Sequence, residues 1–137
     1  MNFFTHSEVM AALQAGIEEA ERRGKIVGIS VVDEGGNLVG SIVMAGAIEP
    51  WLADDSRGKA MATALFGGRP SAEMQERSNS AMFSFLQNHY NGRLNYLKGG
   101  VPIKRGGKLV GAAGAGGAPL DDDEAIALVV AARLGQD

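Results

Sequence analysis

The chain has 137 residues, of which 45% are hydrophobic and 21% charged, as is ordinary for a soluble globular domain. Its formal net charge of −3 disfavours a nucleic-acid-binding protein, because such proteins usually present a basic face. The absence of cysteine excludes disulfides, thiolate metal sites and cysteine nucleophiles, and the two histidines, His6 and His89, disfavour a multi-histidine metal site.

No apolar run approaches the roughly 20 residues that span a bilayer, so we expect no membrane partner. The N-terminal sequence lacks the basic and apolar regions of a secretory signal peptide. We therefore expect one cytoplasmic domain, residues 1–137.

The first predicted element is a helix that begins after Thr5. Thr5 and Glu8 have the spacing of a capping box, in which each side chain accepts from the other residue's backbone N–H. Apolar residues then recur every four positions, at Val9, Leu13 and Ile17, which gives the helix one apolar face. Two arginines and a glycine at 22–24 are typical of its end.

Two β-hairpins are predicted further along. Residues 27–33 and 38–44 are rich in β-branched side chains and are separated by a turn at 34–37. Residues 101–105 and 108–114 form the second pair, joined through Gly106 and Gly107. Pro102 has no backbone N–H, so it favours an edge strand or the start of a strand.

Helices are predicted between and after the hairpins. Residues 54–66 are rich in small residues and favour a closely packed helix, and residues 72–79, with Ser71 as the N-cap, and 80–89 favour two more. Asn91 and Gly92 then indicate a turn. Asp121 and Glu124 have capping-box spacing at the start of a last helix. The order indicates an α+β fold, with helices packed on an antiparallel sheet.

The glycine-rich segment 106–118 raises the question of phosphate binding. It lacks the Lys-Ser/Thr pair of a P-loop, and the acidic residues at 121–124 would repel phosphate from the positive end of the following helix. Residues 35–47 repeat much of its pattern (GGNLVGSIVMAGA against GGKLVGAAGAGGA), which favours a repeated hairpin-plus-helix unit. We interpret the glycines as structural, with a loop that lines a pocket as the functional alternative.

Several polar side chains are candidates for a site. Arg57 or Lys59 would pair with a ligand carboxylate, although Asp55 and Lys59, one helical turn apart, would also pair simply with each other. His89 and Tyr90 would serve proton transfer or haem ligation, and His89 would alternatively interact with a helix C-terminus at the surface. Trp51 is a pocket wall, an oligomer contact or a core residue, and the sequence leaves this open.

The order of three motifs resembles the GlcG/HbpS family, also found as the C-terminal domain of PduO proteins. The motifs are ISVVDEGGNLVGSIVMAGA, RGKAMATALFGGRPS and GGVPIKRGGKLVGAAGAGGAPLDDDEAIA, which together cover most of the chain. The resemblance implies a profilin-like α/β/α sandwich around a five-stranded antiparallel sheet, assembly into homo-oligomers and, in some members, haem binding. The chain departs from the pattern at residues 43–47, which lack the usual Arg and Asp, at Gly116, which replaces a serine, and between 71 and 98, where it carries a longer insert.

These observations lead to two functional hypotheses. In the first, the chain binds a small ligand, either haem or another tetrapyrrole, as the resemblance implies, or a small organic acid. In the second, it is a cofactor-independent isomerase, lyase or hydrolase that acts on an aromatic-derived or dicarboxylic acid, with His89 and Tyr90 as the catalytic candidates. A third alternative is a structural assembly subunit. The candidate ligand-binding residues are Trp51, Arg57, Lys59, Arg93, Gly114 and Gly116.

Overall fold

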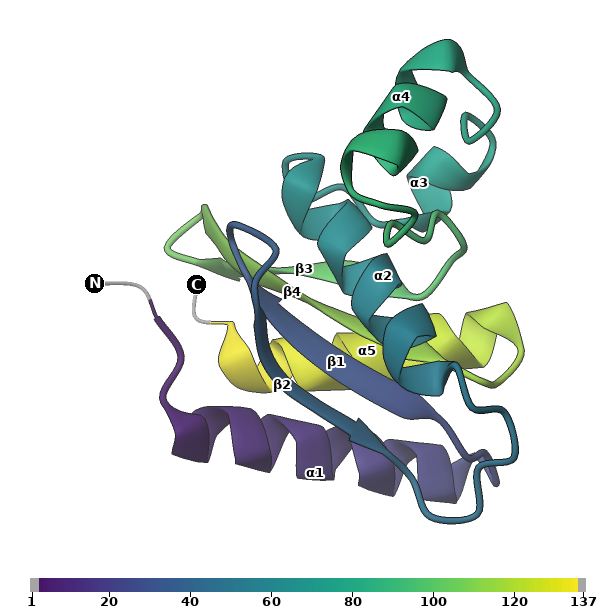
Figure 1. Cartoon of the computed structure of the whole chain (residues 1–137). Helices are drawn as coiled ribbons and strands as arrows, with labels where there is room; N and C mark the ends of the chain where they lie inside the picture. The colour runs from purple at the N-terminus through teal and green to yellow at the C-terminus, as the bar shows by residue number, and fades with distance from the viewer. Residues whose placement is uncertain (1–2, 136–137) are drawn as a thin grey trace.

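Four antiparallel strands form one sheet in the order β2-β1-β4-β3 (Figure 1). The computed structural model describes residues 3–135. The strands are β1 (Gly28–Asp33), β2 (Leu38–Val43), β3 (Gly100–Arg105) and β4 (Lys108–Gly116). The helices are α1 (His6–Arg22), α2 (Leu52–Leu65), α3 (Ala72–Gln75), α4 (Ala81–His89) and α5 (Leu120–Leu134). The predicted α+β class is confirmed.

The helices form a layer on each side of the sheet. Helices α1 and α5 pack against one another and cover one face, whereas α2 lies across the other and carries α3 and α4 beyond it (Figure 1). One apolar cluster joins α1 and α5 to Ile29 and Val31 of β1. A second joins α2 and α4 to Val32, the next residue along the same strand. Adjacent residues of a strand point to opposite faces, so β1 supplies both cores.

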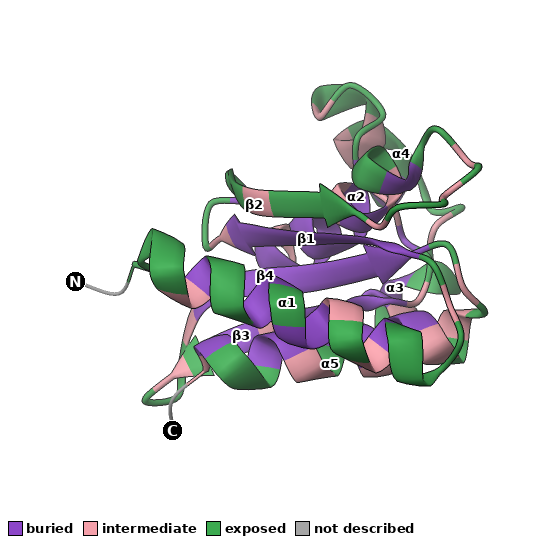
Figure 2. Ribbon diagram, turned by 90° about the horizontal axis from the view of Figure 1, so that it is seen from below, coloured by how far each residue is buried: buried purple, intermediate pink, exposed green. Residues whose placement is uncertain are grey.

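The two predicted hairpins lie side by side in the sheet. β1 pairs with β2 and β3 pairs with β4, and the hairpins meet where β1 pairs with β4, with Ile29 opposite Ala115. Pro102 lies in the edge strand β3, as its missing N–H predicts. The other edge strand, β2, is largely exposed, whereas β1 and β4 are buried (Figure 2).

The fifth strand implied by the resemblance is wrong for the described residues. The segment between α2 and β3 folds into two short helices and an extended connection instead. In that connection the backbone N–H groups of Leu94, Leu97 and Lys98 donate to side chains, not to a neighbouring strand. Because those donors are already used, the segment does not add to the sheet.

The helix starts divide into one confirmed prediction and two corrections. Thr5 and Glu8 form the predicted capping box at the start of α1. The second capping box, with Asp121, is wrong, because α5 begins at Leu120 and its N-cap is Pro119. The helix predicted over residues 72–79 is only the short α3. Ser71 is its N-cap residue, as predicted, but the Ser71 hydroxyl donates to Leu97 O and accepts from Gly100 N and makes no capping bond.

The glycine-rich strand β4 lies against α2 with almost no space between the two backbones. A Cβ at Gly114 would overlap the carbonyl oxygen of Ser56 and lie 2.9 Å from the backbone nitrogen of Ala60. A Cβ at Gly116 would overlap the Asp55 carboxylate. Glycine is needed here because no side chain fits between the strand and the helix, which supports the structural interpretation of the segment.

Candidate functional site

A cavity of about 550 Å³ opens between the first turns of α2 and the connection that follows α4. Its volume is in the range of small-molecule sites in proteins. From the α2 side it is lined by Trp51, Asp54, Asp55 and Arg57, and from the connection by residues 92–95. These are the insert and the helix that the sequence analysis had singled out separately.

A tight turn brings the connection back over α2. Asn91 and Gly92 both have positive φ, 58° and 73°, so the predicted turn is confirmed. The Gln87 side chain then fixes the returning chain, because its amide oxygen accepts from the backbone N–H of Leu94 at 2.9 Å. At Gly58 the connection touches the helix itself, since a Cβ there would lie 2.6 Å from the carbonyl oxygen of Arg93.

Two guanidinium groups line the cavity without an ionic partner among residues 3–135. The buried Nε of Arg57 has no hydrogen-bond partner, and Arg93 uses its Nε to bond the carbonyl oxygen of Tyr90 at 3.1 Å. A buried donor without a partner is costly and rare in folded proteins. Trp51, 58% exposed, adds an aromatic wall. This side of the cavity suits an anionic group attached to an apolar body.

The carboxylate of Asp55 gives the cavity wall a negatively charged group beside the two arginines. Its Oδ1 accepts from the side-chain amide of Asn95 at 2.6 Å, and its Oδ2 lies 3.5 Å from Lys59 Nζ. The side chain is 19% exposed, so it is held in place and still reaches the cavity. The Asp55–Lys59 pair is the one that helical spacing predicts.

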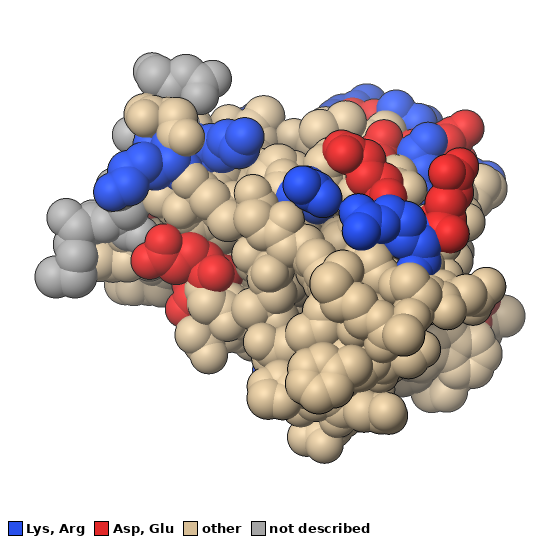
Figure 3. Space-filling view, turned by 90° about the horizontal axis from the view of Figure 1, so that it is seen from above, with Lys and Arg blue, Asp and Glu red and all other residues tan. Residues whose placement is uncertain are grey.

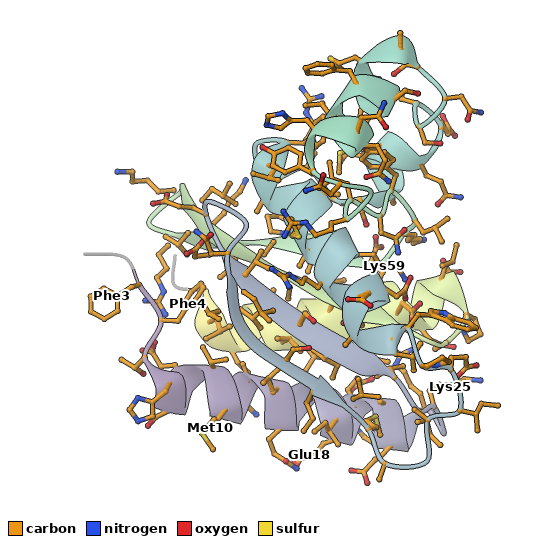
Figure 4. The ribbon with its side chains drawn as sticks, in the orientation of Figure 1. Phe3, Phe4, Met10, Glu18, Lys25 and Lys59 are labelled. Atoms are coloured by element: carbon orange, nitrogen blue, oxygen red, sulfur yellow. The ribbon has the colours of Figure 1, made fainter. Side chains whose placement is uncertain are left out.

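Lys59 itself is buried, with a side chain only 1% exposed, and is not among the residues that line the cavity. Figure 4 labels Lys59 on α2. Its ammonium donates to Ala115 O at 2.9 Å and to Asp123 Oδ2 at 3.1 Å. Burial raises the pKa of Asp123 to about 6, although the Lys59 ammonium and the Ala118 N–H oppose that rise. Lys59 therefore joins the cavity wall to the start of α5.

The acidic residues in the first turn of α5 form three separate ion pairs. Asp121 pairs with Lys98 at 2.6 Å, Asp122 with Arg23 at 2.8 Å, and Asp123 with the buried Lys59. The cations come from different parts of the chain, so consecutive acids hold different parts of the fold together. This supports the view that the glycine-rich segment and its acids are not a phosphate site.

The structure brings together three of the candidate ligand-binding residues, Trp51, Arg57 and Arg93, around the cavity. Lys59, Gly114 and Gly116 lie behind it, in the packing of α2 on β4. His89 and Tyr90 stand outside: His89 is exposed and stacks on Phe85, and Tyr90 is half-buried beside it. Their catalytic role stays a prediction.

Sequence reasoning missed the roles of three residues in this region, Asp55, Asn95 and Asp123. The Asp55–Lys59 spacing was visible but indicated only a stabilising pair. Asn95 carried no local signal, because it reaches Asp55 only through the turn of the chain after α4. Asp123 was also hidden, since it is far from Lys59 in the sequence and resembled a helix-capping acid.

The described residues contain no group of three or more His, Asp or Glu side chains arranged to hold a metal ion. Nor does any helix within 3–135 have the length and apolarity needed to cross a membrane.

Helix α4 carries no Asp, Glu, Lys or Arg, and Figure 3 shows a broad surface without these residues on the face seen from above. Met82 and Phe85, 50% and 66% exposed, are the exposed large apolar residues of α4.

Comparison with known proteins shows the family of the chain. A family model described as "Haem degrading protein HbpS-like" matches residues 4–132. The protein GlcG of Escherichia coli K12 is 34% identical over 104 residues, which are 76% of this chain and 74% of that protein.

Solved structures share the fold. A double mutant of HbpS from Streptomyces reticuli superposes with a TM-score of 0.84 at 31% identity, covering 99% of this chain and 90% of that one. A complex of PduOC with heme superposes with a TM-score of 0.82, covering 95% of this chain and 94% of that one. Its 22% identity makes it evidence for the fold alone.

Proposed function

The chain belongs to the HbpS-like family, and from that premise we propose that it binds a small organic carboxylate in the cavity between α2 and the connection after α4. Arg57 and Arg93 hold the carboxylate, and Trp51 contacts the apolar body of the ligand. The observation that carries the proposal is that Arg57 and Arg93 line the same cavity and that neither guanidinium has an ionic partner among residues 3–135. A carboxylate in the cavity would supply that partner through charge-assisted hydrogen bonds to the guanidinium groups.

Haem is the second candidate, because the family description names haem degradation. The cavity does not fit an axially ligated haem: among its described lining residues none is His, Cys, Met or Tyr, the usual iron ligands. His89 and Tyr90, which lie outside the cavity, are the remaining candidate ligands. Titration with haem tests this: a Soret shift lost in His89→Ala supports haem binding, and an unchanged spectrum overturns it.

The carboxylate proposal is tested by calorimetric titration with 3-phenylpropionate and its neutral amide. We expect the acid to bind and the amide to bind at least about tenfold more weakly, because the amide offers no charge-assisted bond to arginine. Arg57→Gln and Arg93→Gln are each expected to weaken the acid by about tenfold or more. Arg133→Gln is the matched control, since Arg133 is exposed on α5 and does not line the cavity. Equal binding of acid and amide would refute the proposal.

The exposed edge strand β2 supports the expectation of a homo-oligomer. Its residues include no charge and no proline, and Leu38, Val39, Ile42 and Val43 are each at least 39% exposed. Natural proteins usually protect such edges with charge or proline, so an unprotected one favours pairing with another chain. Light scattering of the wild type and of Ile42→Lys tests it, since a charge at the edge is expected to reduce the assembled mass.

A further inference from the structure

We propose that the bound carboxylate also carries a hydroxyl group and that Asp55 accepts its hydrogen bond, so that the site selects hydroxy acids. This inference rests on the proposed function above and names the substrate class of the same cavity. It makes Asp55 a specificity-determining residue, a role that neither the spacing nor the composition of the chain had indicated.

The first step is the unused capacity of the Asp55 carboxylate. An ionised carboxylate accepts about four hydrogen bonds. Among residues 3–135 it receives one, from the Asn95 amide at 2.6 Å, with Lys59 Nζ 3.5 Å from its other oxygen. Because Asp55 lines the cavity and its side chain is 19% exposed, part of this unused capacity is available to a ligand.

The second step is the cost of leaving that carboxylate without a partner. A purely apolar ligand body would displace water from the Asp55 carboxylate without offering a hydrogen-bond donor in its place, which is unfavourable for an ionised group. A hydroxyl donor on the ligand replaces the lost water. The cavity therefore pairs two donors for the ligand carboxylate, Arg57 and Arg93, with one acceptor for a neighbouring group.

The third step decides between a hydroxyl and an ammonium donor. The charge of Asp55 is already balanced in part by Lys59, which is fully buried and cannot move away into water. A ligand ammonium would therefore meet a carboxylate with a cation behind it and would itself have to be desolvated. A neutral hydroxyl gains the hydrogen bond without that repulsion.

The test compares three ligands that share one skeleton and differ only at one carbon: 3-phenylpropionate, 3-phenyllactate and phenylalanine. Calorimetric titration of the wild-type chain is expected to show one enantiomer of 3-phenyllactate binding about tenfold more tightly than 3-phenylpropionate, the change expected from one hydrogen bond to a charged group. Phenylalanine is expected to bind more weakly than 3-phenyllactate. Tighter binding of phenylalanine would overturn the choice of hydroxyl.

Asp55→Ala should abolish the preference for 3-phenyllactate while 3-phenylpropionate still binds. The variant is expected to fold, because Lys59 keeps its pair with Asp123. If it does not, Asp55→Asn, which keeps the size and removes the charge, should lower the preference. Asp54→Ala tests the second carboxylate of the cavity, which lines it from the same helix. Glu73→Ala is the control, since Glu73 is exposed on α3 and does not line the cavity. Loss of the preference in Asp54→Ala alone would overturn the assignment to Asp55.

The failures of the two proposals are distinguishable. If 3-phenylpropionate and 3-phenyllactate bind equally and Arg57→Gln weakens both, the carboxylate site stands and the role of Asp55 is overturned. If none of the three ligands binds the wild type, both the site and this inference fail.

Discussion

Replacing Lys59 by methionine removes the one cation that the structure places between Asp55 and Asp123. The change keeps the length and apolar stem of the side chain, so the packing of α2 on β4 is largely preserved. What remains is a carboxylate, Asp123, that is only 1% exposed and has lost a donor at 3.1 Å. Removing one member of a buried pair typically costs about 3–5 kcal/mol, and we expect that loss in the free energy of unfolding at pH 8.

The cost should depend on pH in a definite direction. The pKa of Asp123 is raised to about 6, so at pH 5 this carboxyl is mostly protonated even in the wild type. Lys59 then balances less charge, and its removal should destabilise the protein less than at pH 8. Urea unfolding of both proteins at the two pH values measures the difference.

Lys98→Met is the matched control, because Lys98, like Lys59, pairs with an aspartate of α5. Lys98 pairs with Asp121 of α5 at 2.6 Å, but the two side chains are 32% and 90% exposed. Exposed pairs contribute about 0–1 kcal/mol, so this variant should be nearly as stable as the wild type. If Lys59→Met and Lys98→Met cost the same at pH 8, burial of the Lys59 pair does not stabilise the fold as argued.

Three further predictions follow from the same packing. Gly114→Ala is expected to lower the free energy of unfolding, measured in urea, by about 2–3 kcal/mol or more, because its Cβ would force α2 away from β4. Gly35→Ala, in an exposed turn, is the control and should change it by no more than about 1 kcal/mol. Equal losses in the two variants would refute the packing argument. The raised pKa of Asp123 adds stability to the wild type that is fully present below pH 3.8 and is lost as pH rises through about 6. Asparagine does not titrate, so the free energy of unfolding of Asp123→Asn should rise relative to that of the wild type as pH increases over this range. Parallel plots of unfolding free energy against pH for the two proteins would contradict this. Trp51→Ala should weaken 3-phenylpropionate several-fold without changing the melting temperature of the free protein, since Trp51 is mostly exposed, and unchanged affinity would remove it from the site.

The local elements could be predicted from the sequence because their causes are local. The Thr5–Glu8 capping box, the Gly106–Gly107 hairpin and the Asn91–Gly92 turn depend on residues within a few positions of one another. The same holds for the rejection of a phosphate loop, which needed only the missing lysine and the acids that follow. Family resemblance added the sandwich correctly and the fifth strand incorrectly, because the chain uses the corresponding donors on side chains.

The site was decided by contacts between distant residues, and no local pattern encodes them. Arg57 and Arg93 share a cavity only because Gly58 lets the connection after α4 touch α2. Lys59 faces inward because Asp123, on another helix, compensates its charge there. A lysine on a helix is by itself an exposed side chain, and only the tertiary fold supplies the buried carboxylate that makes burial of its charge tolerable. The residues and their spacing therefore set the helices and hairpins, while the three-dimensional packing determined which charged side chains line the cavity.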